Sequence, residues 1–267
     1  MKIRIAALVF LALLALGCVL AGWIAPEGYA EQFRSEPDAA CSRAHLLGTD
    51  ELGRDRFARV LYGTRVSLLL APAAALLATV LAGLIGGAAG FFGGQLEGWV
   101  MAVTDLVLAM PWFFLLITVR ALLPLNVAPA ASVSITFALL GCLGWAGAAR
   151  VVCADARALC RSDLALLARA QGAGGLRLLW RHILPNLRPA LAAQFWISIP
   201  VFIFTEANLG MLGLGVAEPL PSWGSLLREL ESCSTGITQP AILAPLVLVI
   251  LTVSSFQIAV RKEEIHA

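Results

Sequence analysis

Few side chains of this 267-residue chain could carry out catalytic or metal chemistry. Lysine occurs only at Lys2 and Lys262, so the interior holds no phosphate-binding loop of the G-x-x-x-x-G-K-[ST] type. The three histidines form no H-E-x-x-H pair and the six cysteines form no C-x-x-C pair, which leaves a zinc site or a dithiol redox site without support. We therefore expect no catalytic residue, no metal ligand and no cofactor in this chain.

Two carboxylates, Asp105 and Glu206, lie within or at the edge of long apolar runs. A charge at membrane depth is unfavourable and often marks a substrate or ion pathway, so both residues are candidates for a substrate pathway. The alternatives are that Glu206 lies near the interface or bonds to a neighbouring helix, and that Asp105 faces water at the inner end of its span.

A basic, glycine-rich segment reads ARAQGAGGLRLLWRHILPN from Ala168 to Asn186. The sequence predicts a short helix over 163–170, and Gly172, Gly174 and Gly175 then break it, because glycine permits the positive φ of a tight turn. A second helical stretch follows, and Pro185 marks the start of another helix. The two helical stretches each have an apolar side, which is expected to pack inward, and a basic side, which is expected to face outward. The apolar side consists of Leu164, Leu166, Leu167, Leu176, Leu179 and Ile183, and the basic side of Arg169, Arg177 and Arg181. We predict a helix–turn–helix knob.

Membrane-spanning helices must position these residues. Apolar residues make up 60% of the chain and charged residues 13%, the net charge is +2 and the mean hydropathy is +0.86. Soluble domains contain about 25% charged residues, so the composition excludes a soluble enzyme, a disordered chain and a nucleic-acid-binding protein. Runs of about 20 apolar residues are long enough to cross a bilayer as helices. Six such runs are predicted, at about 5–25, 66–92, 100–123, 131–149, 190–212 and 237–260.

The fold class is therefore an all-α integral membrane protein with about six transmembrane helices and both termini in the cytoplasm. Lys and Arg favour cytoplasmic loops, and this orientation places eleven of them inside and six in the outer loop between the first two spans. The inner residues are Lys2, Arg4, Arg150, Arg157, Arg161, Arg169, Arg177, Arg181, Arg188, Arg261 and Lys262. We divide the chain into an anchor helix with an outer loop (1–65) and a core (66–267) whose long cytoplasmic loop covers about 150–189.

Glycines spaced three or four residues apart occur at 83–94 and 141–147. Such spacing lets a neighbouring helix approach closely, and it would also suit a gating surface. Pro111 and Pro200 lie within predicted spans and should kink them.

The predicted outer segments offer three further expectations. Residues 45–61 have apolar residues near helical spacing, which fits an amphipathic helix on the membrane surface or a partner-binding segment. Trp223 is expected to anchor at the interface or to contact a docked protein. Cys41 and Cys233 could form a disulfide in an oxidising compartment, although unpaired thiols are the simpler reading.

The basic segment resembles the "EAA" loop of permease subunits of ABC importers. The matching residues are Gly172, with Leu184 and Pro185 twelve and thirteen positions later. The Glu-Ala-Ala of the loop falls on Leu166, Leu167 and Ala168, so its Glu and first Ala are absent. The resemblance implies that this loop docks on an ATPase subunit.

Two other segments resemble the second permease of dipeptide, oligopeptide and nickel importers: HLLGTDELGRD (45–55) and EANLGMLGLGVAEPLPSWG (206–224). This resemblance implies a type I ABC importer permease fold in a prokaryotic plasma membrane. It also implies a second permease, two ATPase subunits that bind ATP and Mg, and an extracytoplasmic solute-binding protein. The rival hypothesis is a self-sufficient, ion-coupled secondary transporter.

Overall fold

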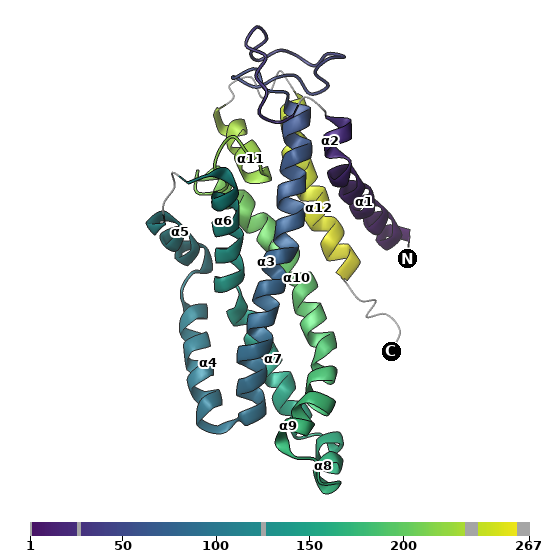
Figure 1. The fold of residues 1–267 in the computed structure, drawn as a ribbon, viewed down its shortest axis with the longest axis vertical. Helices are drawn as coiled ribbons and strands as arrows, with labels where there is room; N and C mark the ends of the chain where they lie inside the picture. The colour runs from purple at the N-terminus through teal and green to yellow at the C-terminus, as the bar shows by residue number, and fades with distance from the viewer. Residues whose placement is uncertain (1, 26–27, 124–126, 233–239, 261–267) are drawn as a thin grey trace. The chain divides into compact units, whose positions relative to one another are not determined.

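The computed structural model describes residues 2–25, 28–123, 127–232 and 240–260, and helices make up its regular structure (Figure 1). The elements are α1 (Lys2–Val19), α2 (Ala21–Ile24), α3 (Arg56–Phe92), α4 (Gly94–Ala109), α5 (Trp112–Leu122), α6 (Pro129–Leu143), α7 (Trp145–Cys160), α8 (Asp163–Ala170), α9 (Gly175–Leu178), the π-helical turn η1 (Leu179–Ile183), α10 (Leu184–Met211), α11 (Trp223–Ser232), the 3₁₀ turn η2 (Pro240–Leu243) and α12 (Ala244–Val260).

The chain forms two compact units. Unit 1 comprises Met1–Pro72, Val119–Phe137 and Ile199–Ala267, and unit 2 comprises Ala73–Thr118 and Ala138–Ser198. Two long helices, α3 and α10, each contribute a segment to both units.

Five helical stretches of the described residues are long and apolar enough to cross a membrane, or six if a bent pair counts as one span. That pair is α4 and α5, which meet at 86°. The bend falls at Met110 and Pro111, because proline lacks the N–H that would continue the helix. The prediction of about six apolar spans with a kink at Pro111 is confirmed.

Several predicted boundaries were wrong. Helix α3 begins at Arg56, ten residues before the predicted start of the second span. Residues 57–61 are thus the first turns of that long helix, and residues 45–55 form turns instead of a surface helix. The reason is a local cap: Asp55 accepts a hydrogen bond from the backbone N–H of Ala58 at 2.7 Å, which satisfies a free donor of the first turn.

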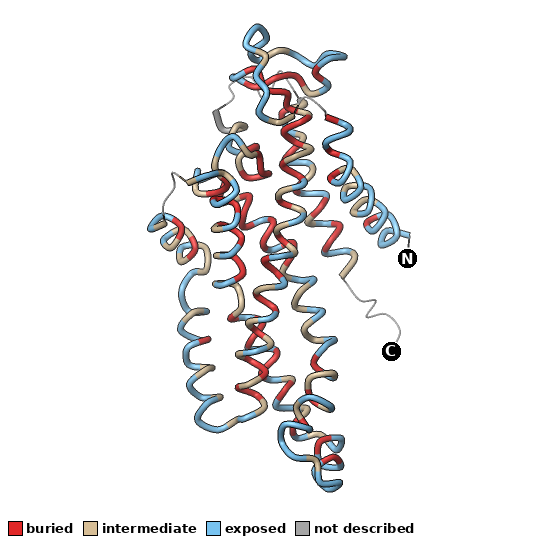
Figure 2. Tube along the Cα trace, viewed as in Figure 1, coloured by how far each residue is buried: buried red, intermediate tan, exposed pale blue. Residues whose placement is uncertain are grey.

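In unit 1, α1 packs against α12, and the two run antiparallel, so the start of α1 and the end of α12 lie at the same end of the unit (Figure 1). This arrangement agrees with both termini lying on one side of the membrane. The outer face of α1 is largely exposed (Figure 2), as expected for a helix that faces lipid or another subunit. Arg261, Lys262 and the start of the predicted sixth span at 237–239 lie outside the described residues.

In unit 2, the glycine stripe of α3 lies against α7 at backbone contact. A Cβ on Gly86 would lie 2.2 Å from the carbonyl oxygen of Ala149, and one on Gly90 would lie 2.4 Å from that of Cys153. Gly141 of α6 similarly meets Leu77 and Ala74. These contacts confirm that the glycines serve close helix packing.

Candidate functional site

The helix–turn–helix predicted in the basic segment is present in unit 2. Helix α8 runs from Asp163 to Ala170, as predicted, with Asp163 in its first turn and Arg169 in its last, where each charge complements the helix dipole. Gly172 has φ of +80°. Hydrogen bonds run from the N–H of Gly172 to Arg169 O at 2.9 Å and from the N–H of Ala173 to Ala168 O at 3.0 Å. This pair of bonds is the Schellman motif, which ends a helix at a left-handed glycine.

Beyond the turn, the chain passes through α9 and η1 into α10 without a separate helix start, and this whole stretch, Gly175–Met211, counts as one apolar helix. Pro185 lies in the first turn of α10. Because it lacks an N–H and its ring crowds the preceding turn, the wider π-helical turn over 179–183 accommodates it.

The predicted packing of this knob was wrong for most of its leucines. We call residues 163–178 the α8–α9 knob. Its buried residues are Ala165, Ala168 and Leu178, which join a core with Val152, Ala156, Cys160, Ile183 and Leu187. Small alanines face α7 because they let α8 approach closely, which turns the larger leucines outward.

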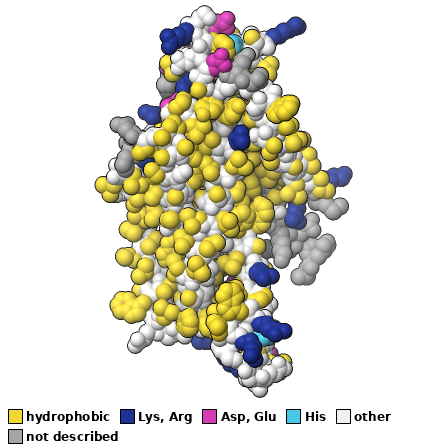
Figure 3. Space-filling view, viewed as in Figure 1, with side chains coloured by type: hydrophobic (Ala, Val, Ile, Leu, Met, Phe, Trp, Pro, Cys, Tyr) yellow, Lys and Arg dark blue, Asp and Glu magenta, His cyan; other side chains and the backbone are white. Residues whose placement is uncertain are grey.

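The exposed surface of the knob and the adjoining η1 turn is therefore both apolar and basic. Its large apolar members, with their exposed fractions, are Leu164 (45%), Leu166 (54%), Leu167 (64%), Leu176 (73%) and Trp180 (63%). Arg169, Arg177 and Arg181 are also exposed, and basic side chains, all of them arginines, gather over the tip that carries α8 and α9 (Figure 3). An apolar patch of this kind, bordered by charges, is typical of a protein–protein contact.

The remaining residues predicted for this loop divide by exposure. Gly172, Gly174 and Gly175 are exposed, and a Cβ on any of them would meet no atom within 4 Å. Leu184 and Pro185 are half-buried, and they lie where the loop enters α10.

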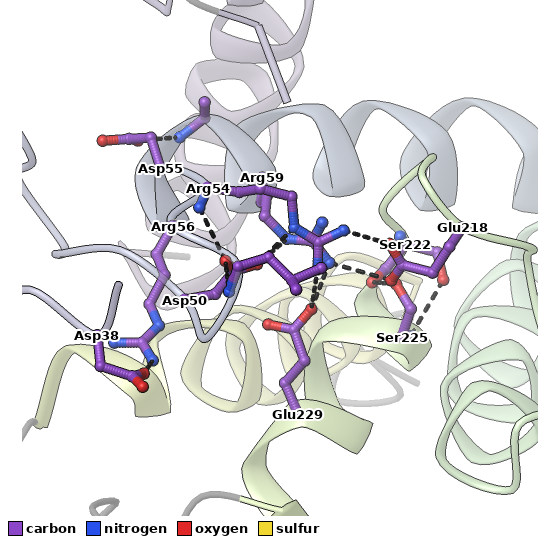
Figure 4. Close-up of polar contacts among 12 residues, drawn as sticks. Asp38, Asp50, Arg54, Asp55, Arg56, Arg59, Glu218, Ser222, Ser225 and Glu229 are labelled. Atoms are coloured by element: carbon purple, nitrogen blue, oxygen red, sulfur yellow. Dashed lines mark hydrogen bonds and ion pairs between the residues drawn. The ribbon is translucent and has the colours of Figure 1, made fainter. Parts of the chain in front are cut away.

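Unit 1 contains a cluster of ion pairs that the sequence analysis missed (Figure 4). Arg54 donates from Nε to Asp50 Oδ2 at 2.6 Å and from Nη1 to Glu218 Oε2 at 2.5 Å. Arg59, whose side chain is fully buried, pairs with Glu229 and, at 3.2 Å, with Glu218. We call these five residues the outer charge cluster. It joins the 50–59 segment to the chain around α11.

The cluster alters the ionisation of its members. Burial lowers the pKa of Arg54, but its hydrogen bonds and ion pairs with Asp50 and Glu218 outweigh burial and raise the pKa above its ordinary value. Burial raises the pKa of Glu218, yet Arg59 and Arg54 bring it below its ordinary value. For Glu229, burial dominates and raises the pKa, with help from Asp50 and Glu218.

A cavity of about 670 Å³ adjoins the outer charge cluster within unit 1. Charged side chains, a serine and a glycine-rich backbone line it: Arg54, Gly210, Gly213, Gly215, Val216, Ala217, Glu218, Ser225, Arg228 and Glu229. Both signs of charge therefore face a space large enough for a small peptide.

Glu206 in α10 is fully buried, and Ser67 of α3 donates a hydrogen bond to its Oε2 at 3.1 Å. This bond to a neighbouring helix is one of the alternatives raised above. Trp223 is also fully buried, and its Nε1 donates to Thr64 Oγ1 at 2.9 Å, so the prediction of an interfacial anchor was wrong. A Cβ on Gly210 would lie 2.3 Å from the Cα of Gly224, so α10 and α11 pack here at backbone contact.

Asp105 of α4 is exposed and forms an ion pair with Arg150 of α7. Arg157 of α7 likewise pairs with Glu97 of α4 at 2.6 Å. Asp105 does not line the 670 Å³ cavity, so its candidacy for a substrate pathway stays a prediction. Cys41 is an exposed thiol, and Cys233 lies outside the described residues.

Comparison with known proteins identifies the kind of membrane protein. Residues 80–263 match the family described as "Binding-protein-dependent transport system inner membrane component". The chain belongs to this family. It is a multi-pass inner membrane protein, as predicted, and the resemblance to ABC importer permeases is confirmed.

Individual relatives carry the names of peptide permeases. The dipeptide transport system permease protein DppC of Bacillus subtilis is 30% identical over 228 residues, which cover 85% of this chain and 69% of the relative. The oligopeptide permease OppC of the same organism is 32% identical over 228 residues, covering 85% and 73%. The glutathione permease GsiD of Pectobacterium atrosepticum is 34% identical over 221 residues, covering 81% and 70%. These relatives are transport permeases and not enzymes.

The family match covers α8, α9, α10 and the cavity-lining segment near Gly215, whereas the 50–59 half of the outer charge cluster precedes it. Sequence signals for that cluster existed, since Arg54 and Arg59 lie in a charged run. Their partners, Glu218 and Glu229, are more than 150 residues away, and one sequence alone did not reveal the pairing.

Proposed function

We propose that this chain is the permease subunit of an ATP-driven importer of di- or oligopeptides, and that its α8–α9 knob receives the motion of an ATPase subunit. The observation that carries this proposal is the exposed leucine and arginine surface of the knob, next to a packed core that contains its alanines. The names of the relatives support peptides as the cargo.

In this proposal ATP is hydrolysed by another subunit, since the interior of the chain has no lysine for a phosphate-binding loop. The proposed partners are two ATPase subunits that bind ATP and Mg, a companion permease and an extracytoplasmic solute-binding protein. In this arrangement the knob and both termini are cytoplasmic, and the outer charge cluster lies on the opposite side of the membrane.

The core beneath the knob supports a lever-like role. Ala165 and Ala168 of α8 share one buried cluster with Val152 and Ala156 of α7 and Leu187 of α10. Close-packed interiors deform little, so a push on the exposed face of α8 would displace α7 and the start of α10 together. Alternating access would follow from movement of these helices.

The test is uptake of a labelled tripeptide into proteoliposomes that contain the complete importer with its binding protein outside. We expect uptake to require ATP, the ATPase subunits and the companion permease. The matched control is the same chain reconstituted alone with an imposed proton or sodium gradient, and uptake by this chain alone would overturn the proposal in favour of an ion-coupled transporter.

A further inference from the structure

A buried arginine in α5, Arg120, has no carboxylate partner among the described residues. Its side chain is 1% exposed. Its Nη2 donates to the neutral acceptors Ser132 Oγ at 3.2 Å and Gly215 O at 3.4 Å, while its Nε and Nη1 are buried without a hydrogen-bond partner.

This environment contrasts with the outer charge cluster of the same unit. Arg54 and Arg59 are buried as well, and each forms ion pairs with three carboxylates within 4.0 Å. A buried cation without a counter-ion is strongly unfavourable, and an ionisable side chain in a membrane protein at such a position marks a functional site. Arg120 is therefore suited to an anion that none of the described residues supplies.

The position of Arg120 indicates where the anion would come from. Gly215, which accepts the bond from Nη2, also lines the 670 Å³ cavity. We call residues 213–217, most of which line the cavity, the 213–217 wall. Ser132 forms two hydrogen bonds with this wall, since its Oγ donates to Gly215 O at 3.3 Å and accepts from the N–H of Ala217 at 3.1 Å. Glycine has no side chain, so it is the backbone of Gly215 that contacts both the guanidinium and the cavity.

We propose that Arg120 binds the C-terminal carboxylate of the transported peptide when the 213–217 wall moves aside during transport. The N–H groups on Nε and Nη1 would then form charge-assisted hydrogen bonds with the carboxylate. A free C-terminal carboxylate is the anionic group that linear peptides share whatever their side chains are. This inference rests on the proposed function, because it assumes that the cargo is a peptide.

The enclosure of Arg120 favours a transient ligand over a permanent one. An acidic residue of the companion permease would have to reach the guanidinium in the assembled state, whereas this chain already encloses it with 1% exposed. A cargo group needs access only in the state in which the wall is open.

The test compares uptake of a tripeptide as the free acid and as the C-terminal amide by the complete importer. The wild type is expected to prefer the acid by at least about tenfold, the ratio that a charge-assisted hydrogen bond supplies. Arg120→Met should abolish the preference, and Arg120→Lys should restore part of it. Arg34→Gln, at an exposed arginine of the same unit, should leave it unchanged.

The thermal stability of Arg120→Met distinguishes carboxylate binding by Arg120 from a purely structural role of this side chain. Replacing an unpaired buried cation with an apolar side chain of similar volume is neutral or stabilising, so Arg120→Met should assemble and unfold at the wild-type temperature or above. Failure of Arg120→Met to assemble, or an unchanged acid preference in it, would overturn the proposal. Equal uptake of acid and amide by the wild type would also overturn it while leaving peptide import intact, whereas uptake of neither form would refute the proposed function.

Discussion

Gly172 provides the sharpest test of the knob, because its backbone conformation and its side-chain space can be separated. It has φ of +80°, and an added Cβ would meet nothing within 4 Å. Gly175, the first residue of α9, is equally open but lies outside the positive-φ region. Gly172→Ala therefore changes backbone strain alone, and Gly175→Ala is its matched control.

The expected size of the effect follows from the conformation. An L-residue in the left-handed region is disfavoured by about 1–2 kcal/mol, which raises the population of locally opened knob by a factor of about 5–30. At Gly175, alanine should stabilise α9 by up to about 1 kcal/mol because of its higher helix propensity. We expect Gly172→Val to be more severe than alanine, since a β-branched residue at positive φ is a true outlier.

Two measurements report on this change. Hydrogen exchange of the amides of Gly172 and Ala173, which form the Schellman bonds, should accelerate in Gly172→Ala and remain slow in Gly175→Ala. ATP-driven peptide uptake should fall in the Gly172 variants, with the amount of inserted protein unchanged. Equal exchange rates and equal uptake in the two alanine variants would refute the reasoning that the left-handed turn holds the knob rigid.

Three further predictions concern other regions. Leu167→Asp, at a leucine that is 64% exposed, should weaken co-purification with the ATPase subunits without lowering the unfolding temperature, whereas the same change at Leu178, which is 2% exposed, should unfold the knob. Gly86→Ala should destabilise unit 2 by about 1–3 kcal/mol because a Cβ would meet the Ala149 carbonyl. Gly147→Ala, at a helical glycine with open space around it, should be neutral or slightly stabilising in the same thermal unfolding assay. Burial raises the pKa of Glu218, but Arg59 and Arg54 lower it below its ordinary value. The ionised Glu218 side chain therefore stabilises the fold fully above that ordinary pKa, and this stabilisation is lost as the pH falls through the folded-state pKa. The difference in stability between wild type and Glu218→Gln, measured by thermal unfolding in detergent, should narrow on acidification, and a difference that widened would contradict this sign.

Local signals in the sequence were sufficient for the spans and for the knob's outline. Apolar runs of about 20 residues identified the bilayer segments, Pro111 identified the bend, and Gly172 identified the turn, because each feature depends on residues close together in the chain. The ends of the helices were less accurate. The start of α3 depends on the cap by Asp55, and α10 continues backward through a π-helical turn that hydrophobicity does not reveal.

Which side of a short helix faces inward was not predictable from hydrophobicity alone. The three leucines of α8 were expected to be buried, but the inward positions belong to Ala165 and Ala168. Close approach to α7 requires small side chains, and the identity of that neighbour is a tertiary fact. The same limitation hid Arg120, because its lack of a carboxylate can be recognised only after its surroundings are known.

Some exposed arginines form ion pairs with described carboxylates, and others do not, and this difference separates helix-packing surfaces from candidate partner-binding surfaces. In unit 2, Arg150 and Arg157 of α7 pair with carboxylates of α4, so their charges serve the helix packing of this unit. On the knob, Arg169 and Arg177 form no ion pair with a described residue and stand beside exposed leucines. A lipid-facing surface would favour the leucines but not the unpaired charges, and a surface facing only water would favour the charges but not the leucines. A protein partner with an apolar groove and acidic residues satisfies both requirements, which supports the proposal that an ATPase subunit binds the knob.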